Sequence, residues 1–230
     1  KATVYEKRKR LGGMMRYGIP SYRFPREKLD GEIASILSLG IEVHTEVDVG
    51  TDITLEDLRH QYDALYLCIG AHTDKKVGIE GEDAIGVMSA VDMLRHIGDN
   101  EMPDFTGMNV AVIGGGNTAM DAARAAIRSG AASATLVYRR TKRYMPADAE
   151  ELELAMADGV RFLELAAPVA QENGRLKCER MTLGAPDEKG RRSPLPTGEL
   201  MEFDCDTVIA FHPYNSFYVW EQLYDKAGNP

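Results

Sequence analysis

Three glycines, and the residues on either side of them, form the stretch of this sequence best suited to binding a ligand. Gly114, Gly116 and Ala119 match the pattern GxGxxG/A, and the β-branched run 110–113 directly precedes them. Such a run suits a parallel strand that is buried on both faces. The glycines then let the backbone turn sharply and approach a pyrophosphate, which lies at the positive N-terminus of the next helix. The stretch therefore predicts a dinucleotide site.

The elements around the glycine pattern decide whether it indicates a binding site, because clustered glycines more often form ordinary turns. The spacing of apolar residues predicts a helix over about residues 117–129, which ends at Gly130. A strand over residues 134–138 follows it. Strand, glycine turn, helix and strand have the order and length of a dinucleotide-binding unit, which favours binding over a simple turn.

Two arginines follow the second strand, at the place where an NAD site usually has an acid for the ribose hydroxyls. Arg139 and Arg140 could bind the 2′-phosphate of NADPH, but they offer no acceptor to the 2′-hydroxyl of NADH. The alternative is a solvated basic strand end. We predict NADPH as the cofactor, because the arginine pair occurs in register with the glycine pattern.

The composition excludes several other classes of function. The 230 residues are 44% hydrophobic and 27% charged, which fits a globular protein of two domains. A net charge of −9 argues against nucleic-acid binding. No apolar run approaches the roughly 20 residues of a membrane span, and the first residues lack the apolar core of a secretory signal, so we expect a cytoplasmic protein without a membrane partner.

The three cysteines are Cys68, Cys178 and Cys205, and they are scattered without a CxxC pair. This spacing encodes neither a disulfide framework nor a redox dithiol nor a metal site, so we expect three buried thiols. We predict no metal ligands.

The first residues predict part of a second dinucleotide fold. The strand 1–6 ends in Glu6 and is followed by Gly12 and Gly13, as in the second strand of such a fold. There Glu6 would bind ribose hydroxyls, and a glycine loop would lie about 20 residues upstream. Because no such loop precedes it, we expect the chain to start inside a domain. A solvated strand-end acid explains Glu6 equally well.

The remaining pattern predicts alternating helices and strands. Helices are expected at residues 25–40, near residue 54, and at residues 89–97 and 148–158; strands are expected at 41–44, 64–69, 160–165, 201–203 and 207–210; and a hairpin is expected between 169–172 and 176–183. The turn-rich stretch 99–106 is the best candidate for a linker between domains.

Five blocks of sequence together resemble the small (beta) subunit of NADPH-dependent glutamate synthase and related NADPH-dependent FAD oxidoreductases. The blocks are Gly12–Pro20, Ile69–Ala71, Gly114–Asp121, Tyr138–Arg140 and Met145–Pro146. Their order and spacing are far more specific than any single motif, and the resemblance covers residues 1–210. It implies an NADPH domain inserted into an FAD domain. It also implies that the flavin takes a hydride from NADPH and passes electrons to an iron–sulfur or glutamate synthase large-subunit-like partner.

The resemblance also implies a role for individual residues. Glu6 would lie at the FAD ribose, Gly13 at the turn against the flavin, Val47 near the flavin adenosine, and Ala71 at a backbone contact to FAD. The NADPH site would comprise the pyrophosphate loop Gly114, Gly115, Gly116, Asn117 and Thr118, then Asp121 on the following turn, and Arg139 and Arg140 at the 2′-phosphate. No side chain is expected to act as an acid or base, because hydride transfer belongs to the cofactors.

We therefore expect an α/β protein with two Rossmann-like dinucleotide-binding folds. Residues 1–104 would form a partial FAD-binding domain and residues 105–210 a nearly complete NADPH-binding domain, while residues 211–230 form a tail of unassigned origin. The family's cysteine-rich iron–sulfur segment and first FAD glycine loop do not occur in this sequence, so we expect binding of NADPH and not of FAD. The alternative function is an NADPH-binding module or sensor without turnover. The sequence makes no prediction about the oligomeric state.

Overall fold

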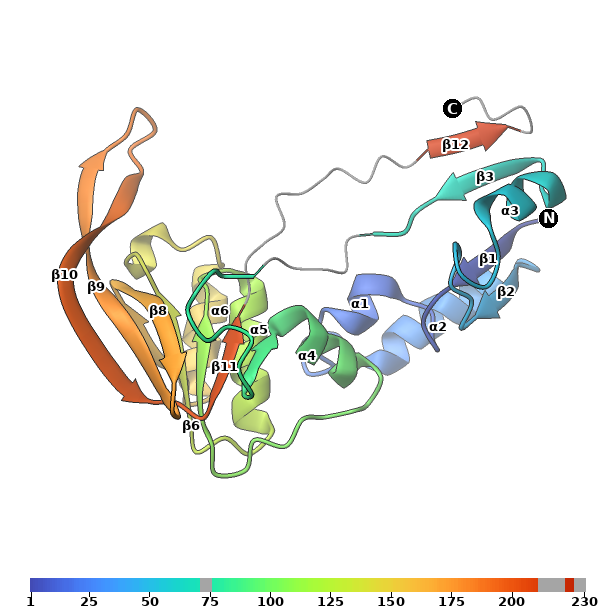
Figure 1. Ribbon diagram of the computed structural model, residues 1–230. Helices are drawn as coiled ribbons and strands as arrows, with labels where there is room; N and C mark the ends of the chain where they lie inside the picture. Colours follow the sequence, from blue (N-terminus) through green and yellow to red (C-terminus); the bar gives the residue numbers. More distant parts are fainter. Residues whose placement is uncertain (71–75, 211–221, 226–230) are drawn as a thin grey trace. The chain divides into compact units, whose positions relative to one another are not determined.

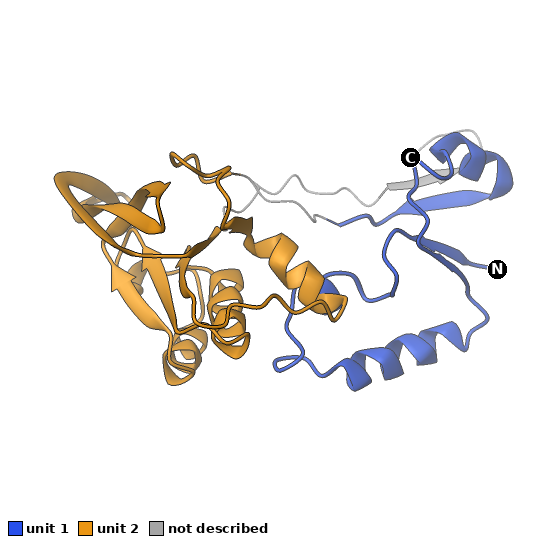
Figure 2. Ribbon diagram, turned by 60° about the horizontal axis from the view of Figure 1, so that its bottom comes forward, with its two compact units in different colours: residues 1–72, 215–230 blue, residues 73–214 orange. Residues whose placement is uncertain are grey.

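The computed structural model describes residues 1–70, residues 76–210 and the backbone of residues 222–225. The chain divides into two compact units, which Figure 2 shows in different colours. Unit 1 contains residues 1–72 and 215–230, and unit 2 contains residues 73–214. Unit 2 has the larger core, because most of the buried apolar side chains belong to it.

A five-stranded parallel sheet forms the centre of unit 2 (Figure 1). In spatial order its strands are β4 (Val87–Ser89), β11 (Thr207–Ala210), β5 (Asn109–Ile113), β6 (Ser133–Tyr138) and β7 (Arg161–Glu164). β5 lies in the middle, and its residues from Val110 to Ile113 are all buried. The continuous apolar run thus forms a parallel strand covered on both faces, as predicted.

Three helices pack against one face of this sheet: α4 (Ala90–Gly98), α5 (Asn117–Arg128) and α6 (Ala149–Ala157). All residues from 119 to 126 of α5 are buried, and most of them are alanines. Their small side chains let α5 lie close to β5 and β6 and to the helices on either side. This arrangement fixes the start of α5 at the end of β5.

An antiparallel three-stranded sheet covers the other face (Figure 1). Its strands are β8 (Ala166–Glu172), β9 (Arg175–Pro186) and β10 (Arg192–Asp204). β8 and β9 are joined through Asn173 and Gly174, which both have positive φ angles (51° and 73°), as a tight hairpin turn requires. The predicted hairpin is confirmed, and unit 2 is an α/β structure with a parallel sheet between two layers.

Residues 76–104 belong to unit 2, whereas the sequence placed a domain boundary after residue 104. β4 pairs in parallel with β11. Further back, the Glu80 N–H donates to the Val169 carbonyl (3.1 Å), and the Gln171 N–H donates to the Glu80 carbonyl (2.9 Å). These bonds attach the segment before β4 to β8, so it is part of the same fold.

The stretch 99–106 accordingly connects α4 to β5 within unit 2 and does not link two domains. Phe105 is almost fully buried in the core under the helices, and its N–H donates to the Ser129 carbonyl (3.0 Å). Turn residues indicated a linker, but a polar connection on one edge of a domain has the same composition.

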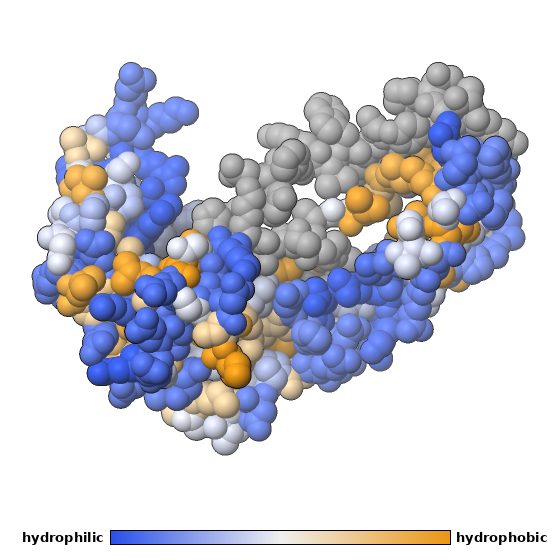
Figure 3. Space-filling model, viewed as in Figure 1, coloured by the Kyte–Doolittle hydropathy of each residue, from blue (hydrophilic) through white to orange (hydrophobic). Residues whose placement is uncertain are grey.

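Unit 1 is smaller and has a thin core. In it β1 (Thr3–Glu6) pairs in parallel with β2 (Glu42–Thr45), and β3 (Ala64–Leu67) pairs antiparallel with β12 (Gln222–Asp225). The helices are α1 (Gly13–Tyr17), α2 (Arg26–Leu37) and α3 (Leu55–Gln61). Tyr17, Leu29 and Leu58 are its buried apolar side chains among the described residues. Figure 3 shows apolar surface around β3, where Ile69 is 74% exposed.

No helix in the described parts of the chain combines the length and the apolar character that crossing a bilayer requires.

A buried ion pair ties α5 to the end of α6. Arg124 is 6% exposed, and its Nε donates to Asp158 Oδ2 at 2.8 Å. Arg128 donates to the same oxygen at 2.9 Å. Burial alone would raise the pKa of Asp158, but the hydrogen bonds from the two guanidiniums outweigh it and hold this pKa below its ordinary value.

We expect Asp158→Asn to lower the free energy of unfolding at pH 7 by about 2 kcal/mol, because the buried Arg124 guanidinium would lose the nearer of its two carboxylate partners and keep only Glu151, at 3.6 Å. A depressed carboxylate pKa stabilises the fold above the unfolded-state value of 3.8, and this stabilisation disappears as the pH falls through the folded-state value. The difference between the variant and the wild type should therefore shrink below about pH 4. Urea titrations at several pH values measure it. Glu153→Gln, an exposed acid on the same helix, is the control.

The cysteines differ from one another in exposure. Cys178 and Cys205 are buried in the core beneath the antiparallel sheet, whereas Cys68 is exposed, so the prediction of three buried thiols was wrong for Cys68. Burial raises the pKa of Cys178 to about 12 and that of Cys205 to about 11. Neither buried thiol will ionise near neutral pH.

We expect the native protein to react with one equivalent of a disulfide reagent such as DTNB at pH 8, and the denatured protein with three, because the thiolate is the reactive form. Cys68→Ser should abolish the native reaction. Rapid reaction of two or three thiols in the native state would contradict the burial of Cys178 on β9 and of Cys205 between β10 and β11.

Candidate functional site

The glycine loop, residues 114–116, joins β5 to α5. Gly114 has a φ of 146°, a value that L side chains rarely adopt, and its N–H donates to the Val137 carbonyl of β6 at 3.2 Å. Gly116 has an extended backbone (φ −99°, ψ 172°) and is the N-cap of α5. The predicted sharp turn at the carboxyl end of the central strand is confirmed.

The N-terminus of α5 is suited to an anion. Its first turn contains no acid, and no side chain caps it. A Cβ built on Gly116 would have only one described heavy atom within 4 Å, the Pro146 Cγ at 4.0 Å, so space is open beside this backbone. Asn117 and Thr118 lie half-buried at the start of the helix. The first N–H groups of the helix and its dipole would therefore attract a phosphate here.

Gly115 packs beneath an aromatic ring that the sequence reasoning did not single out. A Cβ at this position would lie 2.4 Å from Cε2 of Tyr138, which is a clash. The Tyr138 hydroxyl donates to the Tyr144 carbonyl at 2.8 Å, which holds the ring in place. The signal available in the sequence was an aromatic residue at the end of β6, directly before the arginines.

Asp121 lies one turn further along α5 and is 3% exposed. Ala119, the third position of the glycine pattern, is completely buried against the sheet, which explains its small side chain. Gly114 to Thr118 thus form the turn and the start of α5, whereas Asp121 lies one turn later, buried within the helix layer. A cofactor contact of Asp121 stays a prediction.

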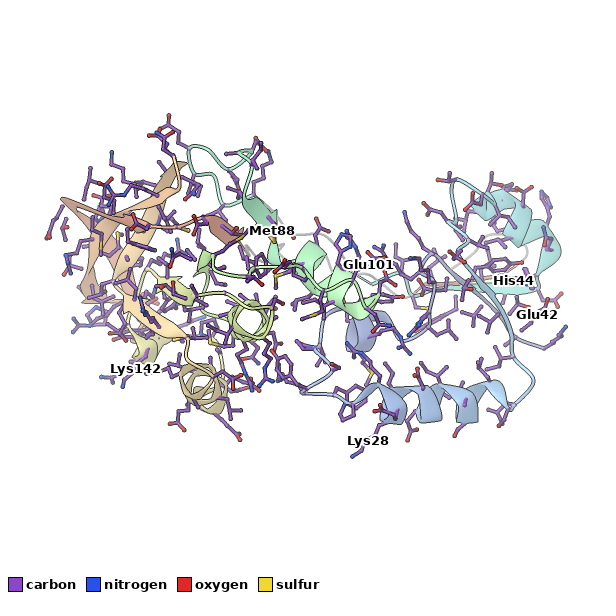
Figure 4. The ribbon with its side chains drawn as sticks, turned by 90° about the horizontal axis from the view of Figure 1, so that it is seen from below. Lys28, Glu42, His44, Met88, Glu101 and Lys142 are labelled. Atoms are coloured by element: carbon purple, nitrogen blue, oxygen red, sulfur yellow. The ribbon has the colours of Figure 1, made fainter. Side chains whose placement is uncertain are left out.

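The loop after β6, residues 139–148, carries four cations, which we call the arginine loop. Arg139, Lys142 and Arg143 are exposed, and Figure 4 shows Lys142 at the surface of unit 2. Arg140 is half-buried, and its Nε donates to the Arg192 carbonyl on β10 at 3.2 Å.

Within the described residues, none of these four side chains forms an ion pair with a carboxylate, although the chain has a net charge of −9. Other arginines of unit 2, such as Arg124 and Arg175, do have acidic partners. The cations of the arginine loop are therefore available to an anionic ligand. Their backbone lies next to the glycine loop, because the Ala147 N–H donates to the Gly115 carbonyl at 3.0 Å.

In unit 1 the structure brings Glu6 and Val47 together at the ends of β1 and β2. The Val47 N–H donates to the Glu6 carbonyl (3.1 Å), and Glu6 Oε1 accepts from the Arg8 N–H (2.7 Å). Thr45, the partner of Glu6 across the strands, borders a hollow of about 360 Å³. Gly13 begins α1, and a Cβ there would meet no described atom within 4 Å. Ala71 lies outside the described residues.

Comparison with known proteins relates the whole of this architecture to a family. The model of the pyridine nucleotide-disulphide oxidoreductase family matches residues 3–211. The chain is 42% identical over 217 residues to the NADP(+)-dependent formate dehydrogenase subunit beta of Moorella thermoacetica. It is 34% identical over 235 residues to the glutamate synthase [NADPH] small chain of Escherichia coli. The predicted resemblance to the glutamate synthase small chain is confirmed.

Coverage of these relatives is partial. The alignments cover 91% and 94% of this chain but 31% of the formate dehydrogenase subunit and 50% of the glutamate synthase small chain. Among solved structures, FprA from Mycobacterium tuberculosis in complex with NADPH superposes with a TM-score of 0.76 over 92% of this chain and 63% of its own, at 21% identity. That likeness shows the fold, a Rossmann-like α/β architecture. The chain belongs to the pyridine nucleotide-disulphide oxidoreductase family.

Proposed function

We propose that unit 2 binds NADPH and that this chain is the NADPH-oxidising part of a flavin oxidoreductase like the glutamate synthase small subunit. The observation that carries the proposal is the meeting of two anion-attracting features. The uncapped N-terminus of α5 lies beside a loop with four cations that have no carboxylate partner among the described residues. Both features are expected where a dinucleotide carries an additional phosphate.

In this proposal the pyrophosphate accepts hydrogen bonds from the backbone between Gly114 and Thr118. Arg139 and Arg140 bind the 2′-phosphate of the adenosine, because a planar guanidinium matches the geometry of phosphate oxygens. Gly116 has no Cβ, so the phosphate can approach its backbone closely. At the end of β6 the chain has Arg139 and Arg140, where folds that bind NADH usually have an acid for the 2′-hydroxyl.

We further propose that unit 1 is part of an FAD domain. Glu6 would bind the ribose, Gly13 and Ala71 would lie along the cofactor, and Val47 would lie near the adenosine. When bound, FAD would accept a hydride from NADPH and release the electrons one at a time. This chain's residues would bind and orient the two cofactors, and an iron–sulfur or large-subunit-like partner would receive the electrons. Relatives described as small or beta subunits support this proposal.

The domain assignment that follows differs slightly from the one based on sequence. We assign NADPH to unit 2, which extends back to residue 73, and FAD to unit 1. Residues 222–225 of the tail pair with β3 of unit 1, and the role of the tail stays open to experiment. A cytoplasmic location stays a prediction.

Calorimetry with NADPH and with NADH tests the proposal. We expect the chain to bind NADPH at least tenfold more tightly, and to oxidise NADPH slowly when FAD and ferricyanide are supplied. Equal affinity for the two nucleotides, or no binding of either, would overturn the assignment of NADPH. Tight binding of NADPH without any oxidation would instead favour the NADPH-sensing module.

A further inference from the structure

The arginine loop is attached to the glycine loop by a reciprocal pair of hydrogen bonds between two helix N-termini. Asn117, the first residue of α5, donates from Nδ2 to Asp148 Oδ2 at 3.2 Å. In return the Asp148 N–H donates to Asn117 Oδ1 at 3.1 Å. One amide side chain thus uses both its donor and its acceptor on a single residue at the far end of the arginine loop.

The position of Asp148 makes this bond pattern informative. Asp148 is the N-cap of α6, and an aspartate there commonly accepts a hydrogen bond from an N–H of its own first turn. Here its side chain makes no such bond, and its carboxylate accepts from Asn117 instead. The Asp148 carboxylate therefore does not cap α6, and instead it connects the start of α6 to the start of α5.

The pair is one of three attachments that fix the C-terminal half of the arginine loop. The Tyr138 hydroxyl donates to the Tyr144 carbonyl, the Ala147 N–H donates to the Gly115 carbonyl, and the Asn117–Asp148 pair follows at the end of the loop. The four cations precede these three points, where the Leu165 N–H donates to the Arg140 carbonyl (3.2 Å) and the Lys142 N–H donates to Glu164 Oε1 (2.6 Å). The cation-bearing half is thus held to β7, and the Asn117–Asp148 pair with the other two attachments sets how the loop returns from there to the α5 N-terminus.

We propose that Asn117 and Asp148 are positioning residues for selection of the 2′-phosphate, an inference that rests on the proposed binding of NADPH. The pair acts through Arg139 and Arg140. It sets where their guanidiniums lie relative to the pyrophosphate, which is bound at the α5 N-terminus in NADPH and NADH alike. Loss of the pair should thus weaken NADPH binding more than NADH binding. If the pair had a purely structural role, its loss would weaken the binding of both nucleotides equally.

The test compares dissociation constants for NADPH and NADH in Asn117→Ala and Asp148→Ala by calorimetry, with melting temperatures as a check on folding. In Asp148→Ala, which leaves the pyrophosphate loop intact, we expect the NADPH affinity to fall about 5- to 10-fold and the NADH affinity to stay within about twofold, because the hydrogen bond to the Asp148 carboxylate is lost. In Asn117→Ala, which lies within that loop, the ratio of NADPH to NADH affinity should fall by the same factor. Glu150→Gln is the matched control, since it removes an exposed acid from the first turn of α6 outside the pair. It should leave the preference for NADPH unchanged.

A double exchange gives a readout that does not depend on stability. Asn117→Asp combined with Asp148→Asn can rebuild both hydrogen bonds. The side-chain bond would then run from the amide at 148 to the carboxylate at 117, while the backbone N–H of residue 148 would still donate to the side chain at 117. The added carboxylate at the α5 N-terminus should weaken the binding of both nucleotides. The ratio of NADPH to NADH affinity should nevertheless return to the wild-type value. If the single variants keep the wild-type ratio, or if the exchange fails to restore it, the inference is wrong while NADPH binding stands. A wild-type protein with no preference would overturn both.

Discussion

Replacing Arg139 and Arg140 together with alanine should weaken NADPH binding about 100-fold and leave NADH binding within about twofold. Hydrogen bonds between charged groups contribute about 1.5–3 kcal/mol each, and about 1.4 kcal/mol corresponds to a factor of ten in affinity. The two guanidiniums act on the single phosphate that distinguishes the nucleotides. The double variant should therefore lose its preference for NADPH over NADH.

The two single variants should differ in a way that the structure dictates. Arg140 already donates from Nε to the Arg192 carbonyl, which fixes its side chain before a ligand arrives. Arg139 is exposed and has no ion pair with the described residues. A pre-ordered guanidinium loses less entropy on binding, so we expect Arg140→Ala to cost more NADPH affinity than Arg139→Ala.

A charge-matched control separates recognition from general electrostatics. Lys189→Ala with Arg191→Ala removes the same two charges from the exposed turn between β9 and β10. Long-range attraction of an anionic nucleotide would fall equally in both double variants, and would fall with salt. If the control pair reduces NADPH affinity as much as the arginine pair does, the 2′-phosphate site lies elsewhere. Undiminished preference without Arg139 and Arg140 would refute the assignment outright.

The centre of unit 2 could be predicted from sequence because its signals are local. The apolar run of β5, the glycine turn and the alanine face of α5 all lie within residues 109–128, and each signal has one physical interpretation. The strand β6 and the arginines follow within the next dozen residues. No long-range information is needed to place a phosphate at the start of α5.

The limits of unit 2 could not be predicted, because they depend on pairing between distant segments. β4 has three residues, too few for a periodic pattern, and its partner β11 lies about 120 residues away in sequence. β10 extends from 192 to 204, although only 201–203 read as a strand. Pro194 and Pro196 lie inside it, and proline is accommodated there because β10 is an edge strand of its sheet.

Within the site, side chains that contact the glycine loop from other elements were also missed. The Tyr138 ring and the Asp148 carboxylate approach from residues that are 20 or more positions away from the loop. Neither residue type marks a dinucleotide site by itself. Their importance follows only from the folded backbone, which makes them the most informative positions to change.

Gly115→Ala should destabilise unit 2 by about 2–3 kcal/mol and lower NADPH affinity more than tenfold. Its Cβ would lie 2.4, 2.6 and 2.9 Å from three atoms of the Tyr138 ring. Overpacking of this kind costs about 1–3 kcal/mol. The ring cannot withdraw freely, because its hydroxyl is bonded to the Tyr144 carbonyl. The arginine loop would have to shift with it.

Gly116→Ala is the matched control on the neighbouring residue. The closest described atom to its added Cβ is 4.0 Å away, which is ordinary contact, so the stability should change little. The methyl group would nevertheless occupy the surface that a pyrophosphate approaches, and NADPH affinity should fall. Stability lost at 115 but not at 116, with affinity lost at both, separates a packing requirement from a ligand requirement. Thermal unfolding and nucleotide titration measure the two quantities.

The φ angle of Gly115 lies outside the range that favours glycine, and the three described atoms nearest to a Cβ there all belong to the Tyr138 ring. Removing the ring should therefore make room for the methyl group. Tyr138→Ala alone should destabilise the protein by leaving a cavity, yet Gly115→Ala should then cost much less than it does in the wild type. A double-mutant cycle measures this coupling. Additive costs would mean that the glycine is required by the backbone or the ligand, and that the ring does not set the shape of the turn.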